Sequence, residues 1–219
     1  MNIGCAILAG GKSSRMGTDK ALLEYDGKHF IEKIAGELSW FDERIIARGS
    51  NSGLNSQLER EWTVIPDRYP GHGPIGGLHA ALSDCASDAL FVVTCDMPLI
   101  ESGLVRELCN CMQETDLEAE RVDAYDVVIY VGIDGKINPL CGVYRKSVVP
   151  VLEEQIVSGR NRVMEALKKL RVKYVTIDSP DQAQQLANIN TPQDYEAMRA
   201  ISSKNPIESE KYPEKGKCN

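Results

Sequence analysis

The sequence predicts an α/β protein with a doubly wound, mostly parallel sheet that carries helices on both faces. Short apolar runs end at glycine, proline or aspartate, and segments with helical periodicity lie between these runs. Continuous apolar runs are typical of strands buried on both sides, and strands that alternate with helices favour a parallel sheet. The 219 residues suffice for one well-cored domain of ordinary size. We therefore expect one domain over residues 1–201.

The apolar runs and the periodic segments give an ordered list of elements. The expected strands are Gly4–Ala9, Arg44–Ala47, Thr63–Ile65, Ala89–Cys95, Asp126–Val131, Leu140–Tyr144 and Val172–Ile177. The expected helices are Phe30–Leu38, Gly76–Leu82, Glu101–Met112, Lys146–Ile156, Arg162–Leu170 and Pro192–Ile201. The acidic stretch 113–123 is expected to be a solvated loop or a frayed helix end. Residues 202–219 contain few apolar side chains and are expected to form a disordered tail.

Composition excludes several classes of function. The net charge of -7 disfavours a nucleic-acid-binding protein, which needs a basic face for phosphates. The seven cysteines are odd in number and irregularly spaced, so we expect reduced thiols and a cytoplasmic protein. The pair Cys109 and Cys111 lacks a second pair to complete a metal site. The chain contains no run of about 18 apolar residues, so no membrane span is expected.

The first predicted strand leads into a loop with a local excess of positive charge. Gly10 and Gly11 allow the backbone to approach a ligand closely, and residues 12–20 contain three cations and one anion, a local charge of +2. The loop is not a Walker A motif, because Ala6 stands where that motif requires glycine, and adjacent glycines do not form the dinucleotide fingerprint. A phosphate-binding loop is favoured over a merely flexible polar turn.

Two aspartates follow predicted strands. Asp67 lies between a strand and a loop rich in glycine and proline, and Asp96 ends the most apolar strand and precedes Met97 and Pro98. Ligands of open α/β sheets bind at the carboxyl ends of the strands, and Mg²⁺ usually uses few protein carboxylates together with phosphates. Asp96 is therefore the strongest candidate for a metal ligand. The alternatives are a turn-forming role for Asp67 and a helix N-cap for Asp96.

The run from Leu8 to Ala21 reads Leu-Ala-Gly-Gly-x-Ser-x-Arg-Met-Gly-x-Asp-Lys-Ala and resembles the N-terminal signature of the molybdenum cofactor guanylyltransferases. That family belongs to a superfamily of nucleotidyltransferases with a Rossmann-like fold. The resemblance implies a nucleotide site and a catalytic set, with Mg²⁺ on Asp96. Gly10 favours guanine, because related cytidylyltransferases have alanine there. The implied nucleotide-binding residues are Leu8, Ala9, Gly10, Gly11, Lys20, Asp67, Gly76, Gly77 and Asp96, and the implied catalytic residues are Arg15, Lys20 and Asp96.

The acceptor side is expected to come from the C-terminal half of the chain. Asn138-Pro139-Leu140-Cys141 resembles a family segment that usually begins with histidine, so an acid-base role at Asn138 is in doubt. Arg160 and Arg162 precede a predicted helix and either clamp a phosphate or form a solvated basic helix start. Asn188 and Asn190 belong to an Asn-x-Asn-Thr-Pro motif that closes the active site in the family. The implied substrate-binding residues are Asn138, Arg160, Arg162, Asn188 and Asn190.

The resemblance implies transfer of GMP from GTP to the phosphate of molybdopterin, with release of pyrophosphate. The expected partners are GTP and molybdopterin, together with proteins that donate molybdopterin or accept the finished cofactor, and neither a nucleic acid nor a membrane is expected. Two alternatives stay open at this point. One is a cytidylyltransferase or sugar-phosphate nucleotidyltransferase of the same fold, and the other is a non-catalytic nucleotide sensor.

Overall fold

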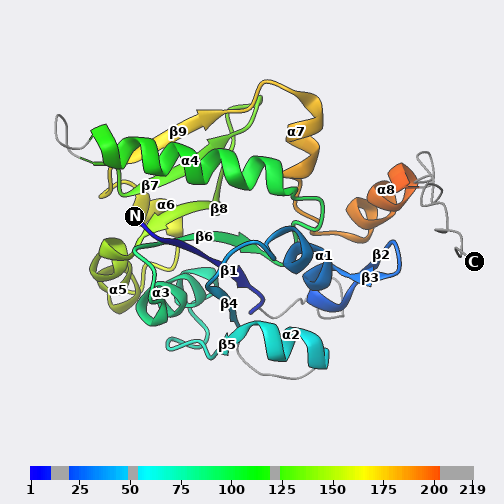
Figure 1. The fold of residues 1–219 in the computed structure, drawn as a ribbon, viewed down its shortest axis with the longest axis horizontal. Coiled ribbons are helices and arrows are strands. Elements are labelled where there is room, and N and C mark those ends of the chain that lie inside the picture. The colour runs from blue at the N-terminus through cyan, green and yellow to red at the C-terminus, as the bar shows by residue number, and fades with distance from the viewer. Residues whose placement is uncertain (11–19, 49–53, 119–123, 203–219) are drawn as a thin grey trace, which may run out of the picture.

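A seven-stranded sheet forms the centre of the molecule (Figure 1). The structure is a computed structural model, and it describes residues 1–10, 20–48, 54–118 and 124–202. The order of the strands across the sheet is β5-β4-β1-β6-β8-β7-β9. Their bounds are β1 Ile3–Leu8, β4 Arg44–Ala47, β5 Thr63–Ile65, β6 Ala89–Thr94, β7 Val127–Val131, β8 Ile137–Arg145 and β9 Val172–Thr176.

The pairing of the strands confirms the predicted, mostly parallel sheet. β1 is parallel to both β4 and β6, β4 is parallel to β5, and β7 is parallel to β9. β8 is the exception and pairs antiparallel with both β6 and β7. The turn between β7 and β8 is too short for the crossover that a parallel neighbour needs, so these strands form a hairpin.

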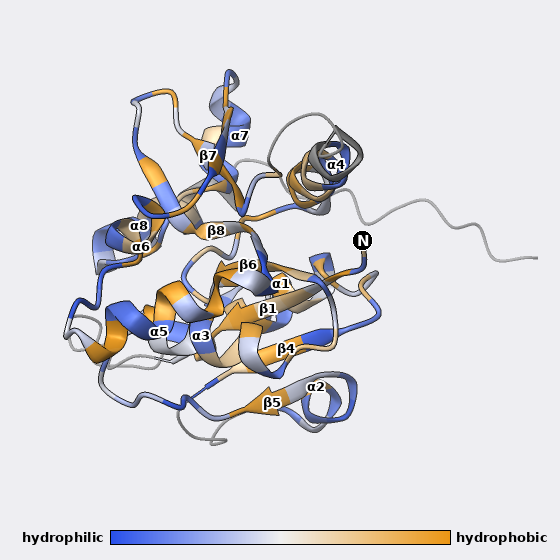
Figure 2. Cartoon of the chain, turned by 90° about the vertical axis from the view of Figure 1, so that its left-hand side faces the viewer, coloured by the Kyte–Doolittle hydropathy of each residue, from blue (hydrophilic) through white to orange (hydrophobic). Residues whose placement is uncertain are grey.

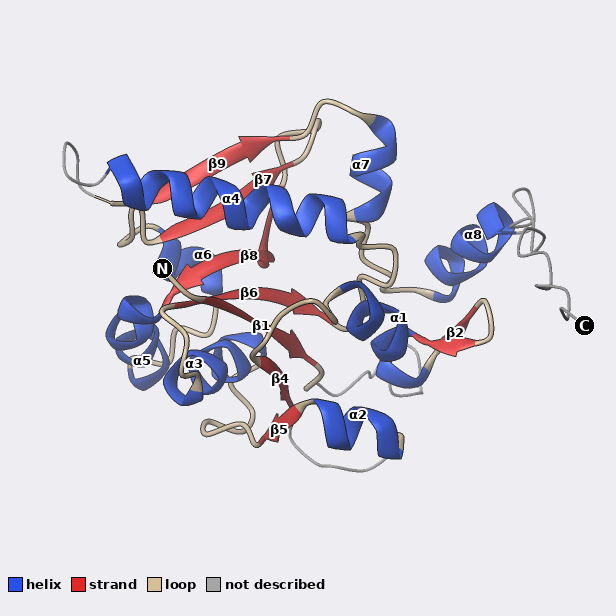
Figure 3. Ribbon diagram, viewed as in Figure 1, coloured by secondary structure: helices blue, strands red, loops and turns tan. Residues whose placement is uncertain are grey.

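Helices cover both faces of the sheet, as expected (Figures 2 and 3). One core cluster contains buried side chains of α1 (Phe30–Glu37), α2 (Ser56–Glu61) and α4 (Ser102–Glu118). The other contains side chains of α3 (Pro74–Asp84), α5 (Val149–Val157) and α6 (Val163–Leu167). Along β1, Cys5 and Ile7 face the first cluster whereas Ala6 and Leu8 face the second. This alternation explains why the central strands are apolar throughout.

The C-terminal helix packs away from the sheet, beside a small hairpin (Figure 3). α8 (Pro192–Ser202) lies near the hairpin of β2 (Glu24–Tyr25) and β3 (Lys28–His29). Tyr25, Phe30 and Met198 are members of a third, small core, and the Tyr195 hydroxyl donates to the Glu24 carbonyl at 2.5 Å. The end of the described chain is thereby fixed to the segment that follows Lys20.

Several elements differ from the sequence-based prediction. The hairpin β2–β3, the helix α2 and α7 (Pro180–Gln185) were not predicted, because short elements with few buried side chains give no periodic signal. Of the two alternatives for residues 113–123, a solvated loop or a frayed helix end, the helix is present as far as Glu118, where α4 ends, and residues 119–123 lie outside the described ranges. α6 is shorter than predicted, and a 3₁₀ turn at Lys146–Val148 precedes α5. The predicted tail lies outside the described residues, apart from Ser202, which ends α8.

Among the residues described, none of the helices is both long and apolar enough to span a bilayer.

Candidate active site

The carboxyl ends of the four neighbouring parallel strands define one edge of the sheet. β1, β4, β5 and β6 run in the same direction and end at Leu8, Ala47, Ile65 and Thr94. Backbone hydrogen bonds continue for one residue beyond the strands, since Ala9 N donates to Ala47 O at 2.9 Å and Cys95 N donates to Leu8 O at 3.1 Å. The predicted residues Leu8 and Ala9 are buried at this edge, and Gly10 is exposed. A ligand at this edge would therefore meet the ends of several strands.

The first group at this edge, the Asp96 cluster, consists of Asp96, Thr94, Lys20 and Asn190. The Thr94 hydroxyl donates to Asp96 Oδ1 at 2.5 Å, and Lys20 Nζ lies 3.5 Å from Asp96 Oδ2. Lys20 Nζ also donates to Asn190 Oδ1 at 2.7 Å. Lys20 and Asp96 expose only 16% and 17% of their side chains, so water screens their attraction incompletely. The structure thus brings together three of the predicted residues from segments far apart in the chain.

Backbone contacts position the segment that carries Asn190. Ile189 N donates to the Asp96 carbonyl at 2.8 Å, which ties this segment to the end of β6. Asp194 Oδ2 accepts from the backbone N–H groups of Asn190 and Thr191 at 3.0 and 2.8 Å, and the Asn190 hydrogen bond is the main cause of a lowered Asp194 pKa. Asp194 N in turn donates to Thr191 Oγ1, so Thr191 and Asp194 form a capping box at the start of α8.

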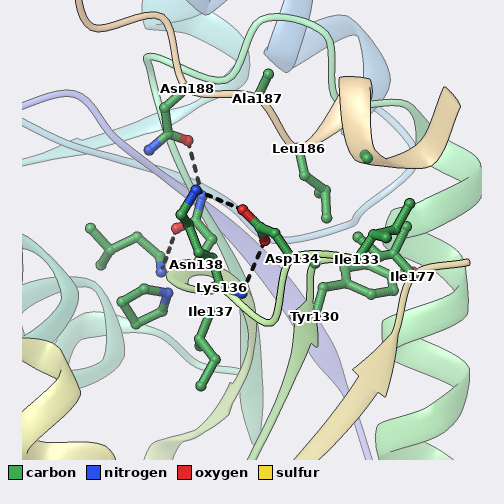
Figure 4. A pocket seen from close by; sticks show the side chains of 14 residues that line it. Tyr130, Ile133, Asp134, Lys136, Ile137, Asn138, Ile177, Leu186, Ala187 and Asn188 are labelled. Carbon is green, nitrogen blue, oxygen red and sulfur yellow. Dashed lines mark hydrogen bonds and ion pairs between the residues drawn. The ribbon is translucent and has the colours of Figure 1, made fainter. Parts of the chain in front are cut away.

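Asn138 joins the same edge to the β7–β8 hairpin (Figure 4). Its Nδ2 donates to Asn188 Oδ1 at 3.0 Å and to Met97 Sδ at 3.2 Å, and its Oδ1 accepts from Leu140 N at 3.1 Å. Both amide protons of Asn138 are thereby engaged with protein atoms. In this arrangement Asn138 holds Asn188 in place, and it has no further proton to donate to a substrate.

A pocket of about 740 Å³ opens beside Asn138 and Asn188 (Figure 4). Ile137, Ile177 and Leu186 contribute apolar side chains to its wall, and Asp134 and Lys136 contribute charges. Lys136 Nζ lies 2.6 Å from Asp134 Oδ2, an exposed ion pair on the hairpin turn. Apolar walls with a few polar groups are typical of pockets for small organic molecules.

Asp67 lies in a second group at this edge, the Asp67 cluster of Asp67, Tyr69 and Gly76. Asp67 Oδ1 accepts from Tyr69 N at 2.8 Å, so Asp67 forms the turn that was the alternative interpretation, and its contact with a nucleotide stays a prediction. A Cβ atom on Gly76 would lie 2.6 Å from Asp67 Oδ1, so only glycine leaves room for this carboxylate beside the first turn of α3. Gly77 is less constrained, because a Cβ there would lie 3.6 Å from Leu8 Cδ2, an ordinary contact.

Arg160 and Arg162 lie on the turn between α5 and α6, and both are exposed. Between them, Asn161 Oδ1 lies 2.8 Å from His72 Nδ1, which joins this turn to the loop that follows Asp67. Within the described part of the chain, neither hydrogen bond nor ion pair links the two guanidinium groups to the Asp96 cluster. The two arginines are thus placed near the Asp67 loop.

Two predicted residues, Gly11 and Arg15, fall outside the described ranges. Thr94, Met97 and Tyr69 were not predicted, although each makes a hydrogen bond to a predicted residue. Thr94 had a signal in the sequence, because it is the one polar side chain of β6 and stands two positions before Asp96. Met97 and Tyr69 had none, because their partners come from the tertiary structure and from the geometry of one turn.

The Asp96 cluster could hold a metal ion that takes most of its coordinating oxygens from a bound nucleotide and from water. No three His, Cys, Asp or Glu side chains within the described ranges are grouped so as to hold an ion by themselves. Mg²⁺ in nucleotide sites needs only one or two carboxylates, since phosphates and water complete its octahedron. Asp96 supplies one partly exposed carboxylate, which suits that arrangement.

A mostly parallel sheet with a lysine and an aspartate gathered at the edge where its strands end is an arrangement typical of α/β nucleotide-binding proteins. The family model described as MobA-like NTP transferase domain matches residues 5–173. The chain therefore belongs to the MobA-like NTP transferase family, and it is a nucleotidyltransferase.

Individual relatives and one solved structure agree with this assignment. A probable molybdenum cofactor guanylyltransferase of Carboxydothermus hydrogenoformans is 34% identical over 207 residues, covering 92% of this chain and 98% of the relative. The molybdenum cofactor guanylyltransferase of Vibrio atlanticus is 33% identical over 86% of this chain and 91% of its own. The structure of molybdopterin-guanine dinucleotide biosynthesis protein A from Archaeoglobus fulgidus has a TM-score of 0.74 and 27% identity, covering 94% of this chain and all of that one.

Proposed function

We propose that this nucleotidyltransferase moves GMP from GTP to the phosphate of molybdopterin, which yields molybdopterin guanine dinucleotide and pyrophosphate. The observation that carries the proposal is the Asp96 cluster, in which Lys20 contacts both Asp96 and Asn190, together with the pocket beside Asn138 and Asn188. The names of the relatives support the choice of guanine and molybdopterin. Gly10 at the end of the first strand supports guanine over cytosine.

The proposed reaction is an in-line displacement at the α-phosphorus of GTP. An oxygen of the acceptor phosphate forms a bond to this phosphorus while the bond to the pyrophosphate oxygen breaks. The protein needs no nucleophile of its own, so positioning and neutralisation of charge carry the catalysis. Lys20 is proposed to neutralise phosphate charge, and the hydrogen bond from its ammonium group to Asn190 supports that role. Arg15 is proposed to act on the triphosphate with Lys20.

Asp96 is proposed to hold Mg²⁺ together with the phosphates of the nucleotide. When bound, the ion supplies positive charge next to the reacting phosphates. Lys20 contacts the same carboxylate, so Lys20 and a metal ion would compete for Asp96. We expect Lys20 to move from Asp96 to the phosphates when the metal and the nucleotide are bound.

The nucleotide and the acceptor are proposed to occupy different parts of this edge. Leu8, Ala9, Gly10 and Gly11 contact the nucleoside, and Asp67, Gly76 and Gly77 form the wall at the start of α3. The pocket beside Asn138 and Asn188 accommodates molybdopterin, with Asn138 acting through Asn188. Arg160 and Arg162 lie near the Asp67 loop and not at this pocket, so they are proposed to bind the phosphate of the acceptor where it meets the nucleotide. The cytoplasmic location stays a prediction from the sequence. So does binding to proteins that deliver molybdopterin or receive the product.

The test is pyrophosphate release by the full chain with molybdopterin and Mg²⁺, with GTP or CTP as the sole nucleotide. Release with GTP alone is the expected result, and it disappears when Mg²⁺ is chelated. A preference for CTP overturns the base, whereas release only with a sugar phosphate overturns the acceptor. Binding of GTP without release of pyrophosphate, whichever acceptor is supplied, identifies a nucleotide sensor.

A further inference from the structure

Tyr69 connects the Asp67 cluster to two helices on one face of the sheet. Its backbone N–H donates to Asp67 Oδ1 at 2.8 Å, and its hydroxyl donates to Glu153 Oε1 of α5 at 3.0 Å. Its ring packs edge-on against the ring of His79 of α3, with a distance of 5.1 Å between centroids and an interplanar angle of 77°. One residue thus contacts the proposed nucleotide-binding carboxylate through its backbone and both helices through its side chain.

His79 packs against Tyr69, and its ring nitrogens form no hydrogen bond with any residue that the structure describes. The side chain is only 3% exposed, and neither ring nitrogen has a hydrogen-bond partner within the described ranges. Burial is the main cause of a lowered His79 pKa, so the ring is neutral at physiological pH. A buried histidine that makes no hydrogen bond contributes mainly through its shape, and the shape contacted here is the ring of Tyr69.

The Asp67 carboxylate has little freedom at the other end of this arrangement. The Asp67 carboxylate occupies the space that a side chain at Gly76 would fill. The Tyr69 carbonyl borders the same space, 3.0 Å from where a Cβ of Gly76 would lie. A shift of Tyr69 would therefore move the donor and the wall of Asp67 together. The neighbouring residues of the loop have their own anchors, an Arg68–Asp84 ion pair and the His72–Asn161 contact.

We propose that Tyr69 is a positioning residue for nucleotide binding, held by Glu153 and His79 so that its backbone N–H fixes the carboxylate of Asp67. The inference rests on the proposed role of Asp67 as a nucleotide ligand. Tyr69 itself contacts no reacting atom, and it lowers the cost of ordering Asp67 before the nucleotide arrives. The position of the Asp67 carboxylate thereby depends on the packing of α3 against α5.

The test is a double-mutant cycle on GTP binding, measured with full-length chain, Mg²⁺ and no acceptor. Removing the hydroxyl in Tyr69→Phe is expected to raise the Kd of GTP about threefold, the value of one ordinary hydrogen bond. Tyr69→Ala also removes the ring, and it is expected to raise the Kd on the order of tenfold. Glu153→Gln keeps an acceptor oxygen and is expected to bind like wild type. Tyr174→Phe, on an exposed tyrosine of the edge strand β9, is the matched control.

The decisive step is the same tyrosine substitution in an Asp67→Ala background. If Tyr69 acts through Asp67, Tyr69→Phe has no further effect on the Kd there, which a general loss of stability would not produce. Equal effects of Tyr69→Phe in both backgrounds, or an unchanged Kd in Tyr69→Ala, overturn the inference. An Asp67→Ala variant that binds GTP like wild type also overturns the inference, because it shows that Asp67 is not a nucleotide ligand. The GTP and CTP comparison above tests the proposed reaction separately.

Discussion

Asp67 and Asp96, which both lie at the edge of the sheet where the parallel strands end, are held in different ways. Asp67 is fixed by its own loop, through a backbone N–H two residues away and the space left by Gly76. Asp96 is held by Thr94, two positions before it, and by Lys20, which follows β1. Asn190, which precedes α8, holds Lys20 in turn. A locally held carboxylate suits a fixed contact, whereas one paired with a lysine from a distant segment suits a group that exchanges partners during a reaction.

The largest effect is expected from removing the carboxylate that exchanges partners. Asp96→Ala is expected to lower kcat by about 10² to 10³, the range seen when one preorganised electrostatic contact to a transition state is lost. The fold should persist, because Asp96 is partly exposed and its backbone contact with Ile189 does not need the side chain. Steady-state pyrophosphate release measures kcat, and circular dichroism checks the fold. Turnover close to wild type in a folded variant would remove Asp96 from the mechanism.

A smaller effect is expected when only the support of Lys20 is removed. Asn190→Ala deletes the oxygen that accepts from Lys20 Nζ at 2.7 Å, so the ammonium group samples more positions. We expect kcat to fall about tenfold, the value of one charge-assisted hydrogen bond. Asn190→Asp keeps an acceptor oxygen and is the matched comparison for the placement of Lys20. If Asn190→Ala lowers GTP affinity and leaves kcat unchanged, Asn190 serves nucleotide binding and not the chemical step.

Gly76 and Gly77 provide a matched pair for the Asp67 cluster. Gly76→Ala places a Cβ 2.6 Å from Asp67 Oδ1, so the carboxylate must move, and we expect the KM for GTP to rise roughly tenfold. Gly77→Ala places its Cβ 3.6 Å from Leu8 Cδ2 and should be tolerated. Alanine favours helix formation over glycine by up to about 1 kcal/mol, so Gly77→Ala should be at least as stable as wild type. In Gly76→Ala the close approach to Asp67 and to the Tyr69 carbonyl opposes that gain. Equal KM values in the two variants would show that the position of Asp67 does not matter for GTP.

These two clusters also differ in how far the sequence predicts them. The sheet was predicted well, because central strands read as apolar runs and their ends carry Asp67 and Asp96. The turn at Asp67 was only the alternative to a nucleotide contact, although the sequence makes it easy to consider because the partner is two residues away. The Lys20–Asn190 contact joins residues 170 positions apart, and no local pattern encodes such a separation. For the same reason the role of Tyr69 was not predicted, because Glu153 and His79 reach it only after α3 and α5 have packed.

The smallest expected effect concerns the pH dependence of stability through His79. Its folded pKa lies below the value of 6.5 for a free histidine, mainly because the ring is buried, and Arg68 lowers it further while Glu153, Asp67 and Asp84 oppose the shift. The unfolded chain therefore binds a proton more readily than the folded chain, so this contribution to stability is complete above pH 6.5 and is lost as the pH falls through the folded pKa.

The measurement is the melting temperature of wild type and His79→Leu across pH 8 to 5, at about two points per pH unit near the unperturbed histidine pKa. Leucine keeps an apolar side chain beneath Tyr69 and removes the titrating group. We expect wild type to lose stability relative to His79→Leu below pH 6.5, whereas above it the difference between the two proteins is constant. The same acidification should weaken GTP binding in wild type more than in the variant, because a charged His79 disturbs the support of Tyr69 and hence of Asp67. Parallel curves over the whole range would exclude His79 as the source of any acid sensitivity.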